Sequence, residues 1–151
     1  MIRSTKKAST IYFLIIFCIL LFSVSCESDN VTYSNPLIEG DKVIIDTGLL
    51  GDKRPEFFSM TVNGKNVAFF IIKINDSVES YIDACQNCYL FKKGFKVKDS
   101  YIICRHCTSE YAIDTLEAGL TSCHPMPLKG ELKGGEYYIS LKEIKKAAKY
   151  F

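Results

Sequence analysis

Two short cysteine pairs constrain the fold of this chain more than any other feature of its sequence. The pairs are Cys85-Gln-Asn-Cys88 and Cys104-Arg-His-Cys107, and fifteen residues separate them. A hairpin that brings two such hooks together can surround one ion or a small cluster with four thiolates, and this spacing is typical of metal sites. The pattern therefore predicts a metal centre with all four cysteines as ligands. In an oxidising compartment the same pairs could instead close as disulfides.

A third cysteine loop follows the two hooks. Cys123 stands in Cys123-His124-Pro125, and Pro125 and Pro127 stiffen this segment. Cys123 is therefore a candidate fifth ligand, redox partner or disulfide partner. His106 and His124 are the only histidines and both adjoin cysteines, so we interpret them as neighbours of the ligands. Neither CxxC pair is followed by histidine, which excludes attachment of a c-type haem.

The N-terminal segment, residues 1–26, reads as a targeting signal. Three basic residues precede an apolar run from Ile11 to Phe22, which is too short to span a membrane comfortably. The run ends in Ser23-Val24-Ser25-Cys26, which resembles the end of a bacterial lipoprotein signal, so Cys26 is the expected lipidation site. An uncleaved N-terminal anchor is the alternative. Both interpretations place the domain outside the cytoplasm and on a membrane.

Without this segment the chain is not basic. The segment holds three of the nineteen basic residues and none of the seventeen acidic ones, so the remainder carries a formal net charge of −1. The electrostatic footprint of a nucleic-acid-binding protein is therefore missing. We expect a flexible tether over residues 27–40 and one small domain over residues 41–151, which is long enough for a modest core.

The domain itself reads as mainly β. Strands are predicted at 42–47, 80–84, 101–104 and 137–141, and two further runs, 57–62 and 67–74, flank the hairpin signal Asn63-Gly64. Ser140-Leu-Lys-Glu143 is a capping-box pattern that starts a short C-terminal helix. Ile144, Ala147 and Ala148 share one face of that helix, which we expect to pack on the sheet, although its lysines could also contact anionic lipid.

The cysteines and their surroundings resemble one known family. The matching residues are Asp83-Ala84-Cys85-x-x-Cys88-Tyr89, Gly94-Phe95, Cys104-x-x-Cys107 and Cys123-x-Pro125-x-Pro127-Leu128. They are similar to the FtrD-like proteins, which are bacterial iron–sulfur membrane proteins found with iron-transport systems. The resemblance covers about 67–141 and implies an iron–sulfur cluster held by these cysteines. The chain departs from the family in having a single N-terminal anchor in place of a multi-helix membrane region.

The order of the elements also resembles another class. Strands alternating with two ligand loops, followed by Pro125-x-Pro127-Leu128 and a last strand, resemble the layout of Rieske iron–sulfur domains, with Cys88 and Cys107 where that class has histidines. The fold expected from these resemblances is a small β domain, Rieske-like or rubredoxin/zinc-ribbon-like. The export signal has no Arg-Arg pair, so a metal would be acquired outside the cytoplasm. This keeps zinc and mononuclear iron open as alternatives.

These observations favour an electron carrier over an enzyme. The sequence has no paired acid and base, activated serine or phosphate-binding loop. The expected function is extracytoplasmic electron transfer by a membrane-anchored iron–sulfur protein, with redox or iron-transport membrane proteins as partners. Two alternatives remain open: a zinc- or disulfide-stapled module that binds another protein, and a metal-delivery protein that uses the same thiols.

Overall fold

The computed structural model describes residues 31–118 and 123–151 of the chain. The predicted signal, with the lipidation site Cys26, and the first residues of the predicted tether lie outside these ranges. Within the described part the structure is built from β-strands, with one short α-helix near the C-terminus, as the sequence predicts. No helix in residues 31–118 and 123–151 is long and apolar enough to span a bilayer.

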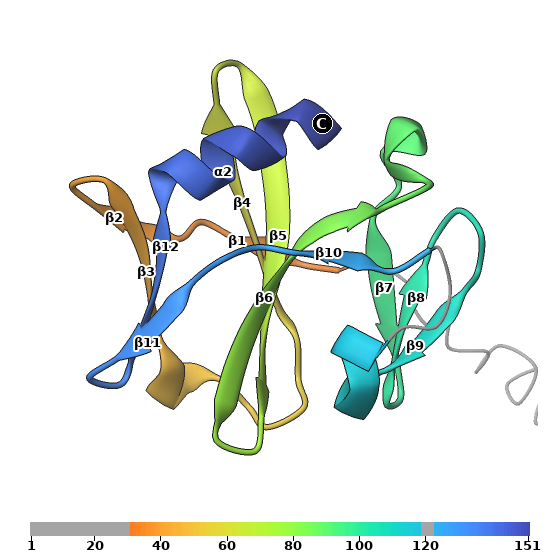
Figure 1. Ribbon diagram of the computed structural model, residues 1–151, viewed down its shortest axis with the longest axis horizontal. Coiled ribbons are helices and arrows are strands. Elements are labelled where there is room, and N and C mark those ends of the chain that lie inside the picture. The colour runs from red at the N-terminus through yellow and green to blue at the C-terminus, as the bar shows by residue number, and fades with distance from the viewer. Residues whose placement is uncertain (1–30, 119–122) are drawn as a thin grey trace, which may run out of the picture.

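The strands form three sheets (Figure 1). The first sheet has the order β1-β4-β5-β6-β10, with β1 Tyr33–Ser34, β4 Glu56–Val62, β5 Lys65–Ile74, β6 Ser77–Cys85 and β10 Pro125–Pro127. The second has the order β11-β12-β3-β2, with β11 Glu131–Lys133, β12 Glu136–Ser140, β3 Lys42–Asp46 and β2 Leu37–Glu39. The third has the order β7-β8-β9, with β7 Phe95–Lys98, β8 Tyr101–Cys104 and β9 Glu110–Ala112.

The hairpin predicted at Asn63-Gly64 is present between β4 and β5. Val62 pairs with Lys65, so the connection is a two-residue turn. Asn63 and Gly64 have φ values of 51° and 75°, the left-handed conformation that tight hairpin turns require and that these residue types tolerate. Turn chemistry therefore sets the register between β4 and β5 in the first sheet.

Strand β5 separates two hydrophobic cores because successive side chains in a strand point to opposite faces. Phe69 and Ile71 enter a first core, which the second sheet and the C-terminal helix complete. Phe70 and Ile72 enter a second core, which continues into the β7–β9 sheet. Strand β6 alternates in the same way, so the side of β6 that faces the second core carries Cys85.

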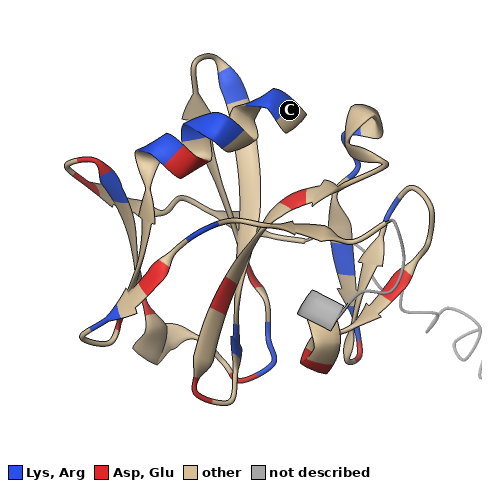
Figure 2. Cartoon of the chain, in the orientation of Figure 1, with Lys and Arg blue, Asp and Glu red and all other residues tan. Residues whose placement is uncertain are grey.

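The C-terminal helix α2 (Leu141–Ala147) begins where the capping pattern predicts. The backbone N–H of Glu143 donates to Ser140 Oγ at 3.3 Å, and Ile144 and Ala147 are buried against the first core. The helix continues as the 3-10 turn η4 (Ala148–Tyr150). Its lysines lie on the outer surface, where Figure 2 shows blue segments along α2. The expected packing of an apolar stripe on the sheet is thus confirmed.

Part of the predicted tether belongs to the sheets. Tyr33–Ser34 pairs in parallel with β4, and Leu37–Glu39 pairs with β3. Both strands are exposed and are held by backbone pairing, to which β1 adds the side-chain contact of Tyr33 with Phe57. The polar residues that dominate 27–36 led to the prediction of a linker. From residue 33 onward the structure therefore has paired strands where the sequence predicts a flexible tether.

Three further 3-10 turns join the strands: η1 (Thr47–Leu49), η2 (Tyr89–Phe91) and η3 (Ile113–Ala118). The turn η2 follows the first cysteine pair directly and projects from the end of the molecule that holds the third sheet (Figure 1). We call this end, made of β7–β9 and the loops at 86–94, 105–109 and 123–124, the cysteine end.

Candidate metal centre

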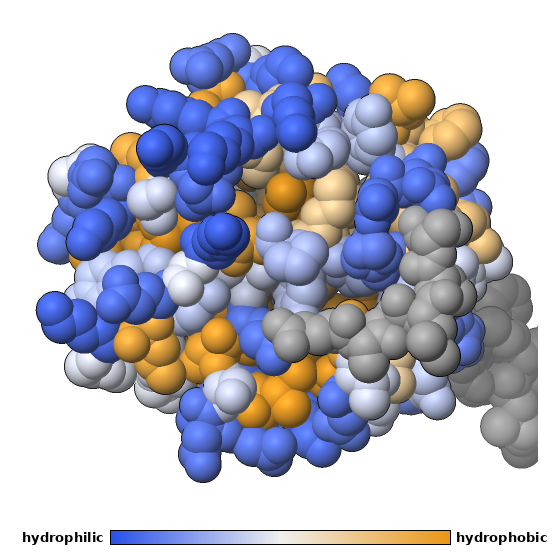
Figure 3. All heavy atoms as spheres, viewed as in Figure 1, coloured by the Kyte–Doolittle hydropathy of each residue, from blue (hydrophilic) through white to orange (hydrophobic). Residues whose placement is uncertain are grey.

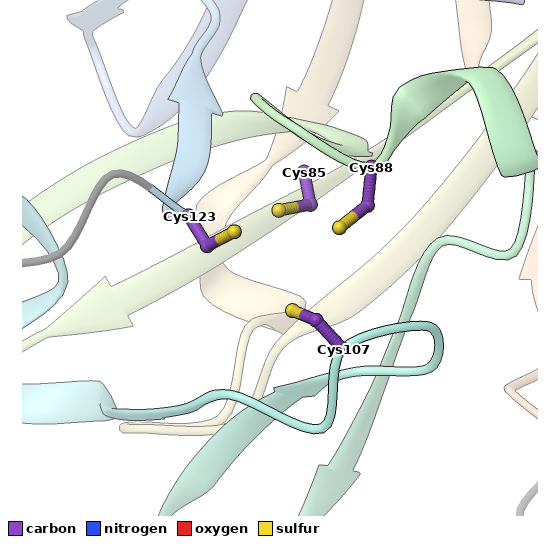
Figure 4. Close-up of side chains that lie close together, drawn as sticks. All are labelled: Cys85, Cys88, Cys107 and Cys123. Atoms are coloured by element: carbon purple, nitrogen blue, oxygen red, sulfur yellow. The ribbon is translucent and has the colours of Figure 1, made fainter.

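Four cysteines converge at the cysteine end. The Sγ atoms of Cys85, Cys88, Cys107 and Cys123 all lie within 4.8 Å of one another. They come from three loops that are far apart in the sequence, and their sulfurs point into one common space (Figure 4). In the described residues all five cysteines are free thiols. Four thiols gathered in this way form a ligand set for a metal centre.

The first hook starts at the end of a strand of the first sheet. Cys85 is the last residue of β6, and its backbone carbonyl accepts from the N–H of Cys88 at 3.0 Å, which closes the hook as a tight turn. The N–H of Gln86 donates to the carbonyl of His124 at 3.2 Å. This bond joins the first hook to the loop that carries Cys123, so the third loop is held beside the first.

The second hook follows strand β8. The N–H of Thr108 donates to the carbonyl of Cys104 at 3.0 Å, and Thr108 has a left-handed φ of 60°. The N–H of Arg105 donates to the carbonyl of Gly94 at 3.0 Å, which ties this hook to the segment that follows the first one. Backbone hydrogen bonds thus connect all three ligand loops before any metal is considered.

The four cysteines that lie closest together are not the four of the two CxxC pairs. Cys123, which the sequence marks only as a candidate fifth ligand, belongs to the compact set of four, and Cys104 stands outside it. Cys104 is still close, because its thiol hydrogen-bonds to Cys107. Cys104 ends β8 opposite Phe95 and is 1% exposed, so its side chain belongs to the second core.

The thiols differ in their readiness to ionise. Burial raises the pKa of Cys85 and of Cys88, and the other thiols raise the pKa of Cys88 further. Burial also acts to raise the pKa of Cys107, but hydrogen bonds from the Ser109 side chain and backbone and from Cys104 and Cys88 outweigh it and lower the value. Neighbouring thiols cannot all ionise in the absence of a cation, so a bound cation would displace protons from them.

Backbone amides also point at the sulfurs. The amide of Asn87 donates to the sulfur of Cys85, and the amide of Ser109 donates to the sulfur of Cys107. Hydrogen bonds of this kind stabilise thiolates and are among the factors that set the reduction potential of iron–sulfur sites. The cysteine end therefore supplies ligands of the right type together with donors that support their charge.

A buried carboxylate lies beside the first hook, and sequence reasoning missed its role. Asp83 is 4% exposed and accepts hydrogen bonds from Tyr33 Oη at 2.6 Å and from the N–H of Phe95 at 2.7 Å. Burial raises the pKa of Asp83, while these two bonds and the charge of Arg105 oppose the shift. The available signal was a single acid in the apolar run Tyr81–Cys85, two residues before Cys85 and hence on the same strand face.

Gly94 is required by this carboxylate. A Cβ at Gly94 would lie 2.5 Å from Asp83 Oδ2, and the residue has a left-handed φ of 64°. Glycine alone satisfies both conditions without strain. Asp83 thus joins β1, β6 and the start of β7 at a point next to the ligands.

The two histidines lie beside the cysteines, as expected, but the compact ligand group consists of cysteines alone within the described residues. The ring of His106 stacks on Phe91 with a centroid distance of 3.6 Å and an interplanar angle of 11°. His124 contributes its backbone carbonyl to the first hook. Each histidine therefore has a structural contact at the site.

A cleft of about 550 Å³ opens beside the first hook. Its wall includes Cys85, Cys88 and Cys104 together with the buried Asp83. It also includes basic and aromatic side chains: Lys65, Lys92, Lys93, Arg105, Tyr89 and Tyr150. One side of the first hook therefore faces a solvent-accessible cleft with a cationic wall.

Comparison with known protein families finds one that matches most of the chain, including its cysteines. The family described as "Membrane iron-sulfur containing protein FtrD-like" matches residues 50–151, which span the whole cysteine end. The chain belongs to the FtrD-like family. The expectation drawn from the cysteine framework is confirmed, and the family is one of iron–sulfur and membrane proteins. An iron–sulfur cluster is the cofactor that fits the four gathered thiols.

Two solved structures are similar to this FtrD-like chain. The ferredoxin of carbazole 1,9a-dioxygenase from Nocardioides aromaticivorans IC177 shares 17% identity at a TM-score of 0.41, with coverage of 71% of this chain and 98% of the other. The quaternary ammonium Rieske monooxygenase CntA, in complex with an inhibitor, shares 14% identity at a TM-score of 0.44, with coverage of 78% and 40%. A search of curated protein sequences gives no match.

Proposed function

We propose that this chain is a membrane-tethered, extracytoplasmic electron carrier of the FtrD-like iron–sulfur family. One observation carries the proposal: four thiols from three separate loops meet within 4.8 Å in a chain that belongs to an iron–sulfur family. A bound cluster would accept and release one electron at a time. Redox or iron-transport membrane proteins are the partners that we propose for it.

The residues of this chain would hold the cofactor and limit its motion. Cys85 ends a strand in the first sheet, and the hydrogen bonds of Gln86 and Arg105 fix the second and third loops against the first. The amides of Asn87 and Ser109 would stabilise charge on the sulfurs. A scaffold held in this way changes little between charge states, which favours electron transfer over chemistry on a substrate.

We propose Cys85, Cys88, Cys107 and Cys123 as the ligands, with Cys104 as a neighbouring thiol that supports Cys107. The compactness of the four Sγ atoms supports this set over the set of two CxxC pairs. The comparison of Cys104→Ser with Cys123→Ser distinguishes the two sets. With the proposed ligands, Cys123→Ser loses most of the cluster, whereas Cys104→Ser retains it with a shifted spectrum.

The experiment that tests the function uses the full chain purified anaerobically. We expect iron and acid-labile sulfide in equal amounts, visible absorption that bleaches on reduction, and a reversible reduction potential. Cys88→Ser should abolish all three signals, and Thr108→Ser is a matched control at an exposed position of the second hook. Colourless protein with one zinc and no sulfide would refute electron transfer and support the stapled module instead. Disulfides without bound metal would refute both the electron-transfer function and the zinc-stapled module.

Membrane attachment is part of the proposal and has its own test. We propose that residues 1–26 direct export and that Cys26 receives the lipid. Mass spectrometry of the N-terminal peptide should find a diacylated or triacylated Cys26, and Cys26→Ser should release the protein from the membrane fraction. Recovery of Cys26→Ser in the membrane with an intact N-terminal segment would favour an uncleaved anchor.

A further inference from the structure

An exposed apolar pair stands directly on the first hook. Leu90 and Phe91, in the turn η2, are 73% and 56% exposed, and this turn begins one residue after the proposed ligand Cys88. Figure 3 shows hydrophobic side chains at the upper right, over the part of the molecule where η2 projects. Large apolar side chains that remain in water next to a functional centre mark contact surfaces for other molecules.

The pair is linked to the second hook as well. Phe91 stacks on His106, and His106 lies between Cys104 and the proposed ligand Cys107. A single apolar platform, made of Leu90, Phe91 and His106, therefore bridges both CxxC loops. Leu90 is two residues from the proposed ligand Cys88, and His106 is next to the proposed ligand Cys107. A molecule bound to the platform would therefore lie close to the metal centre, and electron transfer requires a short distance between the two centres.

The charged side chains in the loops around this platform, which we call its rim, are all basic. The loops at 86–94 and 105–109 contain Lys92, Lys93 and Arg105 but no aspartate or glutamate. Lys65 and Lys149 lie on the neighbouring hairpin and η4, at and near the mouth of the cleft beside the first hook. The acid nearest to the hook, Asp83, is buried and hydrogen-bonded. This local positive charge contrasts with the formal net charge of −1 of the chain after residue 26.

From these observations we infer that the platform is the docking surface for an acidic redox protein, which presents an apolar centre surrounded by carboxylates. An apolar centre with a charged rim is the usual anatomy of an interface, and complementary charge mainly increases the rate of association. Electron-transfer encounters use small interfaces, and a platform of three side chains with a rim matches that scale. The inference rests on the proposed electron-carrier function and specifies the partner of that site.

The transfer at this surface is a single-electron exchange. One electron leaves the reduced form of this protein and enters an oxidised one-electron carrier, so this protein is oxidised by one electron and the carrier is reduced by one. No bond forms or breaks, and no proton needs to cross the interface. The platform residues bring the two centres together and exclude water between them.

The test uses two probes that differ only in surface charge. Reduced full-length holoprotein in phosphatidylcholine vesicles is mixed with native cytochrome c, which is basic, or with fully succinylated cytochrome c, which is acidic, and haem reduction is followed by stopped flow. We expect the acidic probe to react faster at low salt and to lose about ten-fold in rate at high salt. A faster reaction with the basic probe at low salt would overturn the inference.

Substitutions locate the docking surface. The double variant Leu90→Ser/Phe91→Ser should slow reduction of the acidic probe about ten-fold, with metal content and spectrum unchanged. Lys92→Glu/Lys93→Glu should reverse the salt dependence. The matched control is Leu49→Ser, because Leu49 is 82% exposed in η1, away from the cysteines. An unchanged rate in the Leu90/Phe91 variant would overturn the inference.

A second readout does not depend on redox activity. Amide hydrogen exchange in the loops at 86–94 and 105–109 should slow when the acidic probe binds, and the Leu90/Phe91 variant should lose this protection. Protection of these loops without haem reduction would contradict the proposed function while supporting the docking surface. If phosphatidylglycerol vesicles protect the same loops and slow the reaction only in the parent protein, the platform is a lipid contact and the inference is wrong.

Discussion

The two cores of this domain are stabilised by different means. The first core lies between two sheets and α2, and its fully buried members are aliphatic and aromatic side chains such as Val43, Phe69 and Ile139. The second core ends in thiols, a buried carboxylate and three strands of three or four residues. Apolar burial accounts for the first core and for the part of the second core around Phe70, Phe95 and Ile102, whereas we expect the gathered thiols to need a cation. We therefore expect the first core to be stable by itself and the cysteine end to be stabilised further by its cofactor.

Removal of the metal should give the largest effect and should separate the two cores. Iron chelation under reducing conditions is expected to raise amide exchange in β7–β9 and the ligand loops by at least about ten-fold, because clustered thiols without a cation repel one another as they ionise. Exchange in β5 should change little. Mass-resolved hydrogen exchange on the holoprotein, treated with the same reductant but no chelator, is the control. Uniform loss of protection would show that the first core also depends on the metal.

Gly94→Ala should destabilise the cysteine end by about 3 kcal/mol, since it combines a left-handed φ with a Cβ placed 2.5 Å from Asp83 Oδ2. Gly134→Ala is the matched control, with a φ of 61° but no atom within 4 Å of its added Cβ. The control should cost about 1 kcal/mol. Urea unfolding of both variants measures the difference, and equal costs would remove the Asp83 contact from the explanation.

Tyr33→Phe should cost about 2 kcal/mol, because it leaves Asp83 Oδ2 buried without its donor. We expect the loss to appear mainly as faster exchange at Phe95 and the first hook. Tyr138→Phe removes a comparable hydroxyl whose partner, Glu136, is on the surface, and it should change stability by less than about 0.5 kcal/mol. A Tyr33 variant that behaves like the control would mean that β1 does not stabilise the site.

Ile144→Val should have the smallest effect and should leave the cysteine end unaltered. The side chain is fully buried where α2 packs on the first core, so loss of one methylene is expected to cost about 1 kcal/mol. Metal content and visible spectrum should equal those of the parent. The half-exposed Leu132, replaced by Val, serves as the control with almost no cost. Loss of metal in the Ile144 variant would show that the cores are not separable.

Local chemistry made part of this fold predictable. The Asn63-Gly64 turn and the Ser140 cap depend on residues adjacent in the sequence, so their patterns identified a hairpin and a helix start correctly. Strands β9 and β10 have three residues each, and they exist because longer neighbours supply hydrogen-bonding partners. Such strands cannot be read from propensity. The same holds for β1 and β2, which the sequence assigns to a tether.

The site was only partly predictable, for a geometric reason. The cysteine spacing indicated a metal centre but not which four thiols approach one another. Cys104 faces the second core because β8 is paired there with β7, while the bond between Gln86 and His124 brings Cys123 inward. Both effects depend on tertiary contacts. The contact between Tyr33 and Asp83 joins residues fifty positions apart and left no trace in local sequence.

The bond between Tyr33 and Asp83 also limits how far the metal centre can stand from the bilayer. Six residues lie between the proposed lipid-bearing Cys26 and Tyr33, which makes seven steps along the chain, and a fully extended chain covers at most about 3.5 Å per step. The anchor point of the domain would then lie no more than about 25 Å from the lipid surface. Because Tyr33 contacts the strand that ends in Cys85, a lipid on Cys26 would keep the cysteine end close to proteins embedded in the same membrane.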